Sequence, residues 1–173
     1  SGIPVNAGYM EELNIKTPVV DYINKNQKRT PVIWENVRLD VYTHNLALEY
    51  IKKKKPKLVY IAYGETDDFA HGEKYDFYIN SLNYTDNMIA ELWGYVQSNK
   101  FYKDNTYFII TTDHGRGLME DWSGHGTSQA SWLAILGPNI EKTGLVEGEF
   151  FTNQIAETIM QISKKSKTKI PTD

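Results

Sequence analysis

The chain has 173 residues, of which 40% are hydrophobic and 13% aromatic, a composition sufficient for one full-sized hydrophobic core. Its formal net charge of −3 argues against a protein that binds the nucleic-acid backbone, and no apolar run approaches the roughly 18 residues of a membrane span. Cysteine is absent, which excludes disulfides and thiolate metal ligands.

Residues 1–36 are interpreted as a linker or as a partial segment of a domain. Glycine and proline interrupt this region, and only residues 19–23 have the pattern of a short helix. The chain begins at Ser1 without a methionine, so we expect either a processed protein or a piece of a longer one. An α/β metal-binding core is expected over residues 37–163, and a basic flexible tail over 164–173.

The core region opens with a predicted helix over residues 39–54. Its last turn is rich in lysine, which favours a helix C-terminus, and Pro56 ends it. We interpret the four lysines 52–55 as a solvated helix end rather than as a nucleic-acid patch. The next segment, 58–63, is a short apolar run between Pro56 and Gly64, and is typical of a strand buried on both faces of a parallel sheet.

A long amphipathic helix is predicted over residues 75–99, from an apolar stripe with a period of 3.6 residues. Strands follow at 106–112 and 131–136, and Thr152 can cap a last helix. This alternation of strands and helices predicts an α/β fold with a mostly parallel sheet flanked by helices.

Three of the four histidines lie in motifs that also contain glycine and, in two cases, aspartate. The motifs are Asp67-Asp68-Phe69-Ala70-His71, Asp113-His114-Gly115 and Gly124-His125-Gly126. Imidazole and carboxylate together suit Zn²⁺ or Mn²⁺, and five candidate ligands are more than one tetrahedral site needs. We therefore predict two divalent metals, with Zn²⁺ expected and Mn²⁺ as the alternative. The candidate ligands are Asp67, His71, Asp113, His114 and His125.

Two of these motifs directly follow predicted strands, where open α/β sheets bind their ligands. Asp67 and His71 are four residues apart, so one helical turn places both on the same face. We expect the ligand atoms of Asp67, His71 and His125 to converge within about 5 Å, because they would share one cation. His44 lies inside a predicted helix without such a motif, and we interpret it as an ordinary hydrogen-bonded histidine.

The order of these motifs resembles the C-terminal half of the catalytic domain of the alkaline phosphatase superfamily. That superfamily includes phosphatases, phosphodiesterases, cofactor-independent phosphoglycerate mutases and sulfatases. The resemblance implies an alkaline-phosphatase-like fold truncated on its N-terminal side. It also implies that Asp67, His71 and His125 hold one Zn²⁺, and that Asp113 and His114 contribute to the second.

The family's remaining Asp ligand and its Ser or Thr nucleophile have no counterpart in this sequence. Thr17 and Thr30 precede prolines, but neither follows a strand that ends in Asp, so we interpret both as turn residues. The chain is thus predicted to be a fragment of a metal-dependent phosphoric or sulfuric ester hydrolase that acts on a small molecule. We expect the parent to be a phosphomonoesterase or phosphodiesterase, and this fragment alone to be inactive.

Several alternatives stay open. Three histidines disfavour the calcium sulfatases, because Ca²⁺ prefers oxygen ligands, while a mutase-like phosphotransferase and a non-catalytic metal-binding module both remain. Arg116 is either a clamp for a substrate oxyanion or a surface residue, and Trp122 either walls a pocket or packs. The sequence leaves oligomeric state open, and the resemblance implies an extracytoplasmic or periplasmic location, although no signal segment is evident.

Overall fold

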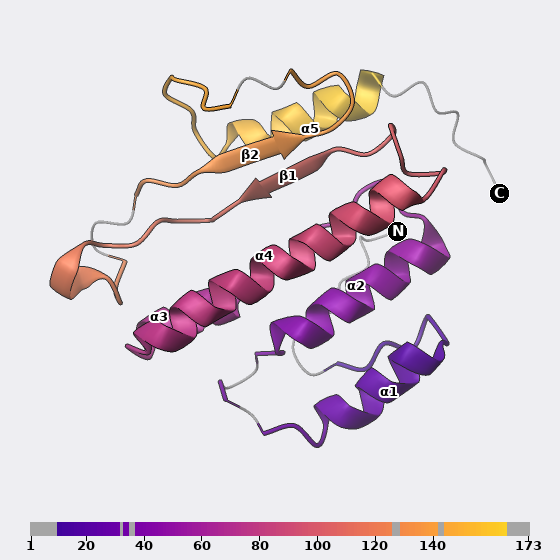
Figure 1. The fold of residues 1–173 in the computed structure, drawn as a ribbon, viewed down its shortest axis with the longest axis horizontal. Coiled ribbons are helices and arrows are strands. Elements are labelled where there is room, and N and C mark those ends of the chain that lie inside the picture. Colours follow the sequence, from indigo (N-terminus) through magenta and orange to yellow (C-terminus); the bar gives the residue numbers. More distant parts are fainter. Residues whose placement is uncertain (1–9, 32, 35–36, 126–128, 142–143, 166–173) are drawn as a thin grey trace.

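The computed structural model describes residues 10–31, 33–34, 37–125, 129–141 and 144–165. Five helices, a short 3-10 helix and two strands make up this part of the chain (Figure 1). In chain order they are α1 (Pro18–Gln27), α2 (Asp40–Lys54), α3 (Glu65–His71), α4 (Tyr75–Ser98), β1 (Phe108–Thr111), η1 (Met119–Asp121), β2 (Leu133–Leu136) and α5 (Gln154–Lys165).

The buried core lies between α1 and α2. It consists of Ile15, Val20, Ile23 and Leu46, with Tyr42 and Tyr50 packed against it. Helix α1 begins after Thr17, whose hydroxyl accepts a hydrogen bond from the Val20 N–H at 3.2 Å. This packing favours a partial segment over a linker for this stretch, while the domain boundary at residue 36 stays a prediction.

Helix α2 ends where the sequence predicts. Lys55 adopts a left-handed conformation with φ of 47°, and its N–H bonds to the Ile51 carbonyl at 3.2 Å. Pro56 follows and cannot continue the helix. The long helix α4 and the C-terminal helix α5 also occupy their predicted regions, within one or two residues of the expected ends on α4.

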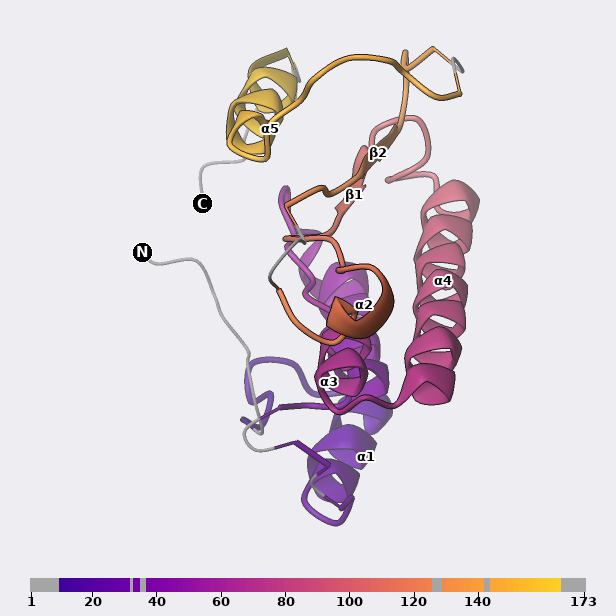
Figure 2. The same ribbon diagram turned by 90° about the vertical axis from the view of Figure 1, so that its left-hand side faces the viewer.

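The sheet is smaller than predicted, and its pairing is different. Among the described residues it consists of β1 and β2, which pair antiparallel with Phe108 opposite Leu136 and Thr111 opposite Leu133. No parallel pair is found in the part of the chain that the structure covers, so the expected mostly parallel sheet is not confirmed, while the expected α/β class is consistent with these helices and strands. The pair lies between α5 on one side and α2 and α4 on the other (Figure 2).

The strand predicted at 58–63 is also absent from the structure as a strand. No strand among the described residues pairs with it, and Tyr60 is 89% exposed. An apolar run becomes a buried strand only when a neighbouring strand pairs with it, which the run itself does not determine.

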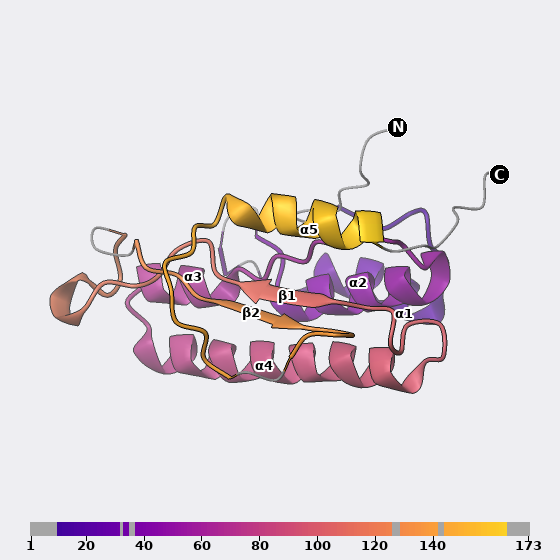
Figure 3. The same ribbon diagram turned by 90° about the horizontal axis from the view of Figure 1, so that it is seen from above.

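Four parts of the fold that contain or flank the histidine motifs lie at one end of the molecule. These are α3, the end of β1, the start of β2 and η1 (Figure 3). Because β1 and β2 are antiparallel, the connection between them starts and finishes at this same end. No helix among the described residues is long and apolar enough to cross a membrane.

Candidate metal centre

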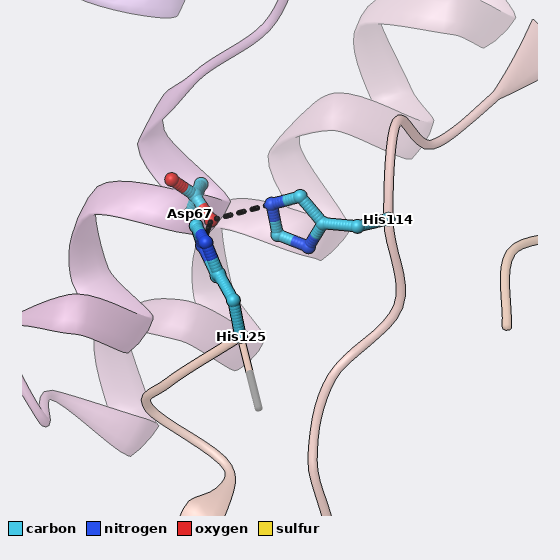
Figure 4. A group of neighbouring side chains, drawn as sticks. All are labelled: Asp67, His114 and His125. Carbon is cyan, nitrogen blue, oxygen red and sulfur yellow. Dashed lines mark ion pairs between the residues drawn. The ribbon is translucent and has the colours of Figure 1, made fainter. Parts of the chain in front are cut away.

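Side chains from three separate segments meet at this end. Asp67 comes from α3, His114 follows β1, and His125 follows η1 (Figure 4). His71 also lies on α3, at its last residue. Ligand atoms of Asp67, His114 and His125 all lie within 4.8 Å of one another, a spacing that could hold a metal ion.

Helix α3 places its two candidate ligands on one face, as the four-residue spacing predicts. His71 Nε2 lies 3.4 Å from Asp67 Oδ2. The opposite face is packed: Ala70 is fully buried, and the Phe69 ring stacks on Phe77 at 5.3 Å and meets the edge of Trp34 at 5.6 Å. This packing leaves the Asp67 and His71 face turned toward the other motifs.

The His114 ring is oriented by the backbone carbonyl of the next residue, Gly115. Its Nδ1 lies 2.7 Å from the Gly115 carbonyl, which can only accept, so Nδ1 carries the proton. In the neutral ring, Nε2 therefore presents a lone pair, and it lies 3.4 Å from Asp67 Oδ1. The Thr112 and Ser131 side chains, 2.9 Å apart, join the two segments that flank the strand pair here.

His125 completes the group from the loop after η1. Its Nε2 lies 3.7 Å from Asp67 Oδ1 and 2.8 Å from His71 Nε2. Two imidazole nitrogens at 2.8 Å form a hydrogen bond only when one of them carries a proton and donates it to the lone pair of the other. A metal ion replaces such a proton when it takes both nitrogens as ligands. The three distances among Asp67, His71 and His125 fall within the expected 5 Å.

Trp122 packs against aromatic side chains of α4. Its ring lies 5.5 Å from Tyr75 and 5.9 Å from Tyr78, both in the first turn of α4. This contact ties the loop that carries His125 to α4, beside α3.

Asp113 is the candidate ligand that the structure leaves at the edge. Its side chain is 90% exposed, and its Oδ2 lies 3.8 Å from His114 Nε2. The other carboxylate oxygen accepts the His114 N–H at 3.0 Å. The geometry therefore groups the three histidine candidates around Asp67 and places Asp113 outside this group.

Arg116 lies inside the group rather than on the open surface. Its side chain is 17% exposed, and Nη2 makes a charge-assisted hydrogen bond to Asp67 Oδ1. Its other terminal nitrogen, Nη1, is buried and has no hydrogen-bond partner among the described residues. A buried donor of this kind suits an anionic ligand.

Several negatively charged carboxylates lie close to Asp67 on α3. Burial first, and then the negative charges of Asp67 and Glu65, raise the pKa of Asp68 above its usual range. A site that combines the Asp67 carboxylate with imidazole nitrogens fits a divalent cation, and Arg116 adds a cationic contact to Asp67.

The fourth histidine and the two threonines have structural roles, as the sequence suggests. His44 is buried, with Nδ1 2.9 Å from Tyr63 Oη and Nε2 3.2 Å from Glu91. Thr17 caps the start of α1. Thr30 lies just past the end of this helix, and its hydroxyl is 3.0 Å from the carbonyl of Asn26 in the last turn. Both threonine hydroxyls thus serve α1. In Figure 1 this helix lies apart from α3, which carries Asp67 and His71.

Asp40 and Glu65 were not among the predicted site residues, and they join the start of α2 to the start of α3. Neither residue was a candidate ligand, and their contact spans 25 residues of sequence. An acid in the first turn of a helix is common, and nothing local signals that it will cap a different helix.

A family model described as Sulfatase matches residues 18–162, a range that includes α1 and all five candidate ligands. No curated protein and no solved structure matches the chain.

Proposed function

The chain belongs to the sulfatase family, part of the alkaline phosphatase superfamily, and from this we propose that it provides the metal-binding part of a metal-dependent ester hydrolase. We further propose that the substrate is a small phosphoric ester, monoester or diester. The family description itself points to sulfuric esters, so the proposal of a phosphoric ester depends on the chemistry of the ligands.

The observation that carries the proposal is the approach of three imidazoles to one carboxylate. Nε2 atoms of His71, His114 and His125 lie 3.4, 3.4 and 3.7 Å from Asp67. Ca²⁺ prefers a shell made only of oxygen, whereas Zn²⁺ and Mn²⁺ accept imidazole. This donor set therefore favours a zinc or manganese hydrolase over a calcium-dependent sulfatase.

We assign Asp67, His71 and His125 to one metal, and His114 with Asp113 to a second. When bound, such ions would polarise the ester and neutralise its negative charge. The protein's own part is to hold donors in place: the Gly115 carbonyl fixes the His114 tautomer, and Trp122 anchors the loop of His125.

Arg116 is proposed to orient the anionic oxygens of the ester. Its buried Nη1 lacks a partner, and a planar guanidinium can offer two parallel N–H groups to one phosphate. Since Nη2 contacts Asp67, the guanidinium lies beside the proposed ligands and within reach of a ligand held there.

We propose that the nucleophilic hydroxyl comes from outside this chain, since Thr17 and Thr30 are engaged at the ends of α1. The same fact favours a second candidate, a module that binds metal without catalysing a reaction. Activity of a longer parent protein distinguishes the two.

Metal retention tests the proposal. The chain is incubated with excess Zn²⁺, desalted and analysed for zinc by elemental analysis. We expect about one tightly held Zn²⁺ per chain, and a loss of it in His71→Ala and His125→Ala. Asp86→Asn, an exposed change on α4, serves as the matched control and should retain the metal. A wild-type chain that retains no zinc would overturn the proposed function.

A further inference from the structure

Helices α2 and α3 exchange hydrogen bonds at their first turns. The Asp40 carboxylate accepts the Gly64 N–H at 2.9 Å and the Glu65 N–H at 3.1 Å. In return, the Glu65 carboxylate accepts the Asp40 N–H at 2.9 Å. We call these three hydrogen bonds the reciprocal cap.

Neither helix has a cap of its own. The residues that precede α2 and α3, Leu39 and Gly64, provide no side-chain hydrogen bond to the first turn. The first N–H groups of a helix have no partner inside it, and a buried one left unpaired is costly. Asp40 is only 2% exposed, so water cannot easily replace its carboxylate.

The reciprocal cap matters because α3 is only seven residues long. A helix of two turns has little stability of its own, and its position depends on contacts with the rest of the fold. Asp67 and His71 lie on this helix, so a shift or fraying of its first turn displaces both. Binding sites tolerate displacements of only about 0.5 Å before they weaken.

We propose that Asp40 and Glu65 are positioning residues for the metal centre: through the reciprocal cap they fix α3 so that Asp67 and His71 face His114 and His125. This inference rests on the proposed function, because the position of α3 matters here only if Asp67 and His71 bind a metal. It concerns two side chains that would contact neither the metal nor the substrate.

Zinc affinity of the cap variants tests the proposal, measured by competition with a chromogenic chelator. Asp40→Asn puts an amide N–H₂ against one of the two N–H donors, and Glu65→Ala removes the acceptor for the Asp40 N–H. We expect each to weaken zinc binding about tenfold, the lower end of the effect of supporting residues around a metal. Glu65→Gln loses the charge but keeps an acceptor oxygen, and it should bind zinc nearly as the wild type does.

Ile23→Ala is the control for lost stability. It removes a core side chain of α1 that is 3% exposed, so it should lower stability while leaving zinc affinity unchanged. Equal losses of affinity in Glu65→Gln and Glu65→Ala would mean that charge, not position, is responsible, and would overturn the proposal. A matching loss in Ile23→Ala would overturn it as well.

Amide hydrogen exchange of the metal-free chain separates this inference from the proposed function. We expect Asp40→Asn to exchange faster over residues 65–71 while α4 keeps its protection. Unchanged exchange over 65–71 would overturn the reciprocal cap as a positioning device. A wild-type chain that binds no zinc would overturn the proposed function, and the exchange rates would still decide whether the cap fixes α3.

Discussion

Two cations would compete for the Asp67 carboxylate: the Arg116 guanidinium, which contacts it, and the proposed metal ion. The guanidinium contacts Oδ1, the same oxygen that lies 3.4 Å from His114 and 3.7 Å from His125. A cation that binds between these side chains must share Asp67 with Arg116 or displace it, and it meets a positive charge at close range.

Arg116→Gln should therefore bind Zn²⁺ more tightly than the wild type, by up to about tenfold, because the competing cation is gone. The same variant should be less stable without metal, since the Arg116 hydrogen bond to Asp67 is lost. Calorimetric titration with Zn²⁺ and thermal unfolding of the metal-free chain measure the two effects. Weaker zinc binding in Arg116→Gln would show that Arg116 supports the metal rather than competing with it.

At the scale of elements, α3 depends on its neighbours at both ends and in its middle. The reciprocal cap holds its first turn, while Phe69 lies between Trp34 and Phe77. Gly72 ends the helix, and a Cβ added there would meet the Trp34 ring at 2.9 Å. These contacts make α3 sensitive to changes that touch no ligand.

Gly72→Ala should destabilise the folded chain. Its φ of −77° suits alanine, and the lost freedom of the unfolded chain favours the substitution by roughly 0.4–1 kcal/mol. The clash with Trp34 outweighs this gain, since overpacking a fixed ring typically costs about 1–3 kcal/mol. Urea unfolding should show a net loss of about 1 kcal/mol, and a rise in stability would mean that the Trp34 ring yields easily.

Asp40 gives the α2–α3 contact a dependence on pH. Burial raises the pKa of Asp40 to about 6, more than the two N–H donors lower it, and the charges of Glu65 and Asp68 raise it further. The folded chain thus holds this proton more tightly than the unfolded chain does. The resulting stabilisation is fully present below about pH 4 and is lost as the pH rises through 6.

Between pH 4 and pH 7 the wild type should lose up to about 3 kcal/mol relative to Asp40→Asn, which has no proton to release. Urea unfolding of both chains across this range gives the difference in their free energies of unfolding. Parallel pH profiles for the two chains would contradict the raised pKa of Asp40.

The helices, and the shared face of Asp67 and His71, could be predicted from the sequence because their signals are local. Apolar periodicity and lysines at a helix end indicate α2 and α4, and the four-residue spacing indicates the shared face of Asp67 and His71. The pairing of strands is not local: 58–63 has the composition of a strand but has no partner among the described residues. For the same reason the contact between Asp40 and Glu65 could not be predicted.

At the scale of the whole molecule, the proposed function pairs a set of candidate metal ligands in this chain with a nucleophile that we expect to come from outside it. The Sulfatase match covers residues 18–162, and the donors of the centre come from three segments within that range. Thr17 and Thr30 serve α1 instead of the centre. A metal centre alone can bind and polarise an ester, but the covalent route also needs an activated hydroxyl.

This chain should therefore hydrolyse 4-nitrophenyl phosphate, bis(4-nitrophenyl) phosphate and 4-nitrophenyl sulfate barely above background with Zn²⁺ or Mn²⁺. Loss of a nucleophile typically removes several powers of ten in rate. A longer parent protein should hydrolyse at least one phosphate ester. Robust turnover by the present chain that vanishes in Thr17→Ala or Thr30→Ala would place the nucleophile here. A parent that acts only on the sulfate would correct the proposed substrate.

The central claim is that Asp67, His71 and His125 together bind a metal ion, and crystals of the chain soaked in Zn²⁺ test it most directly. Anomalous scattering at the zinc edge should give a peak among these three side chains, about 2.0–2.2 Å from a carboxylate oxygen of Asp67 and from the Nε2 atoms of both histidines. A fully soaked crystal whose zinc peaks lie only at other residues, with these three side chains bare, would contradict the claim.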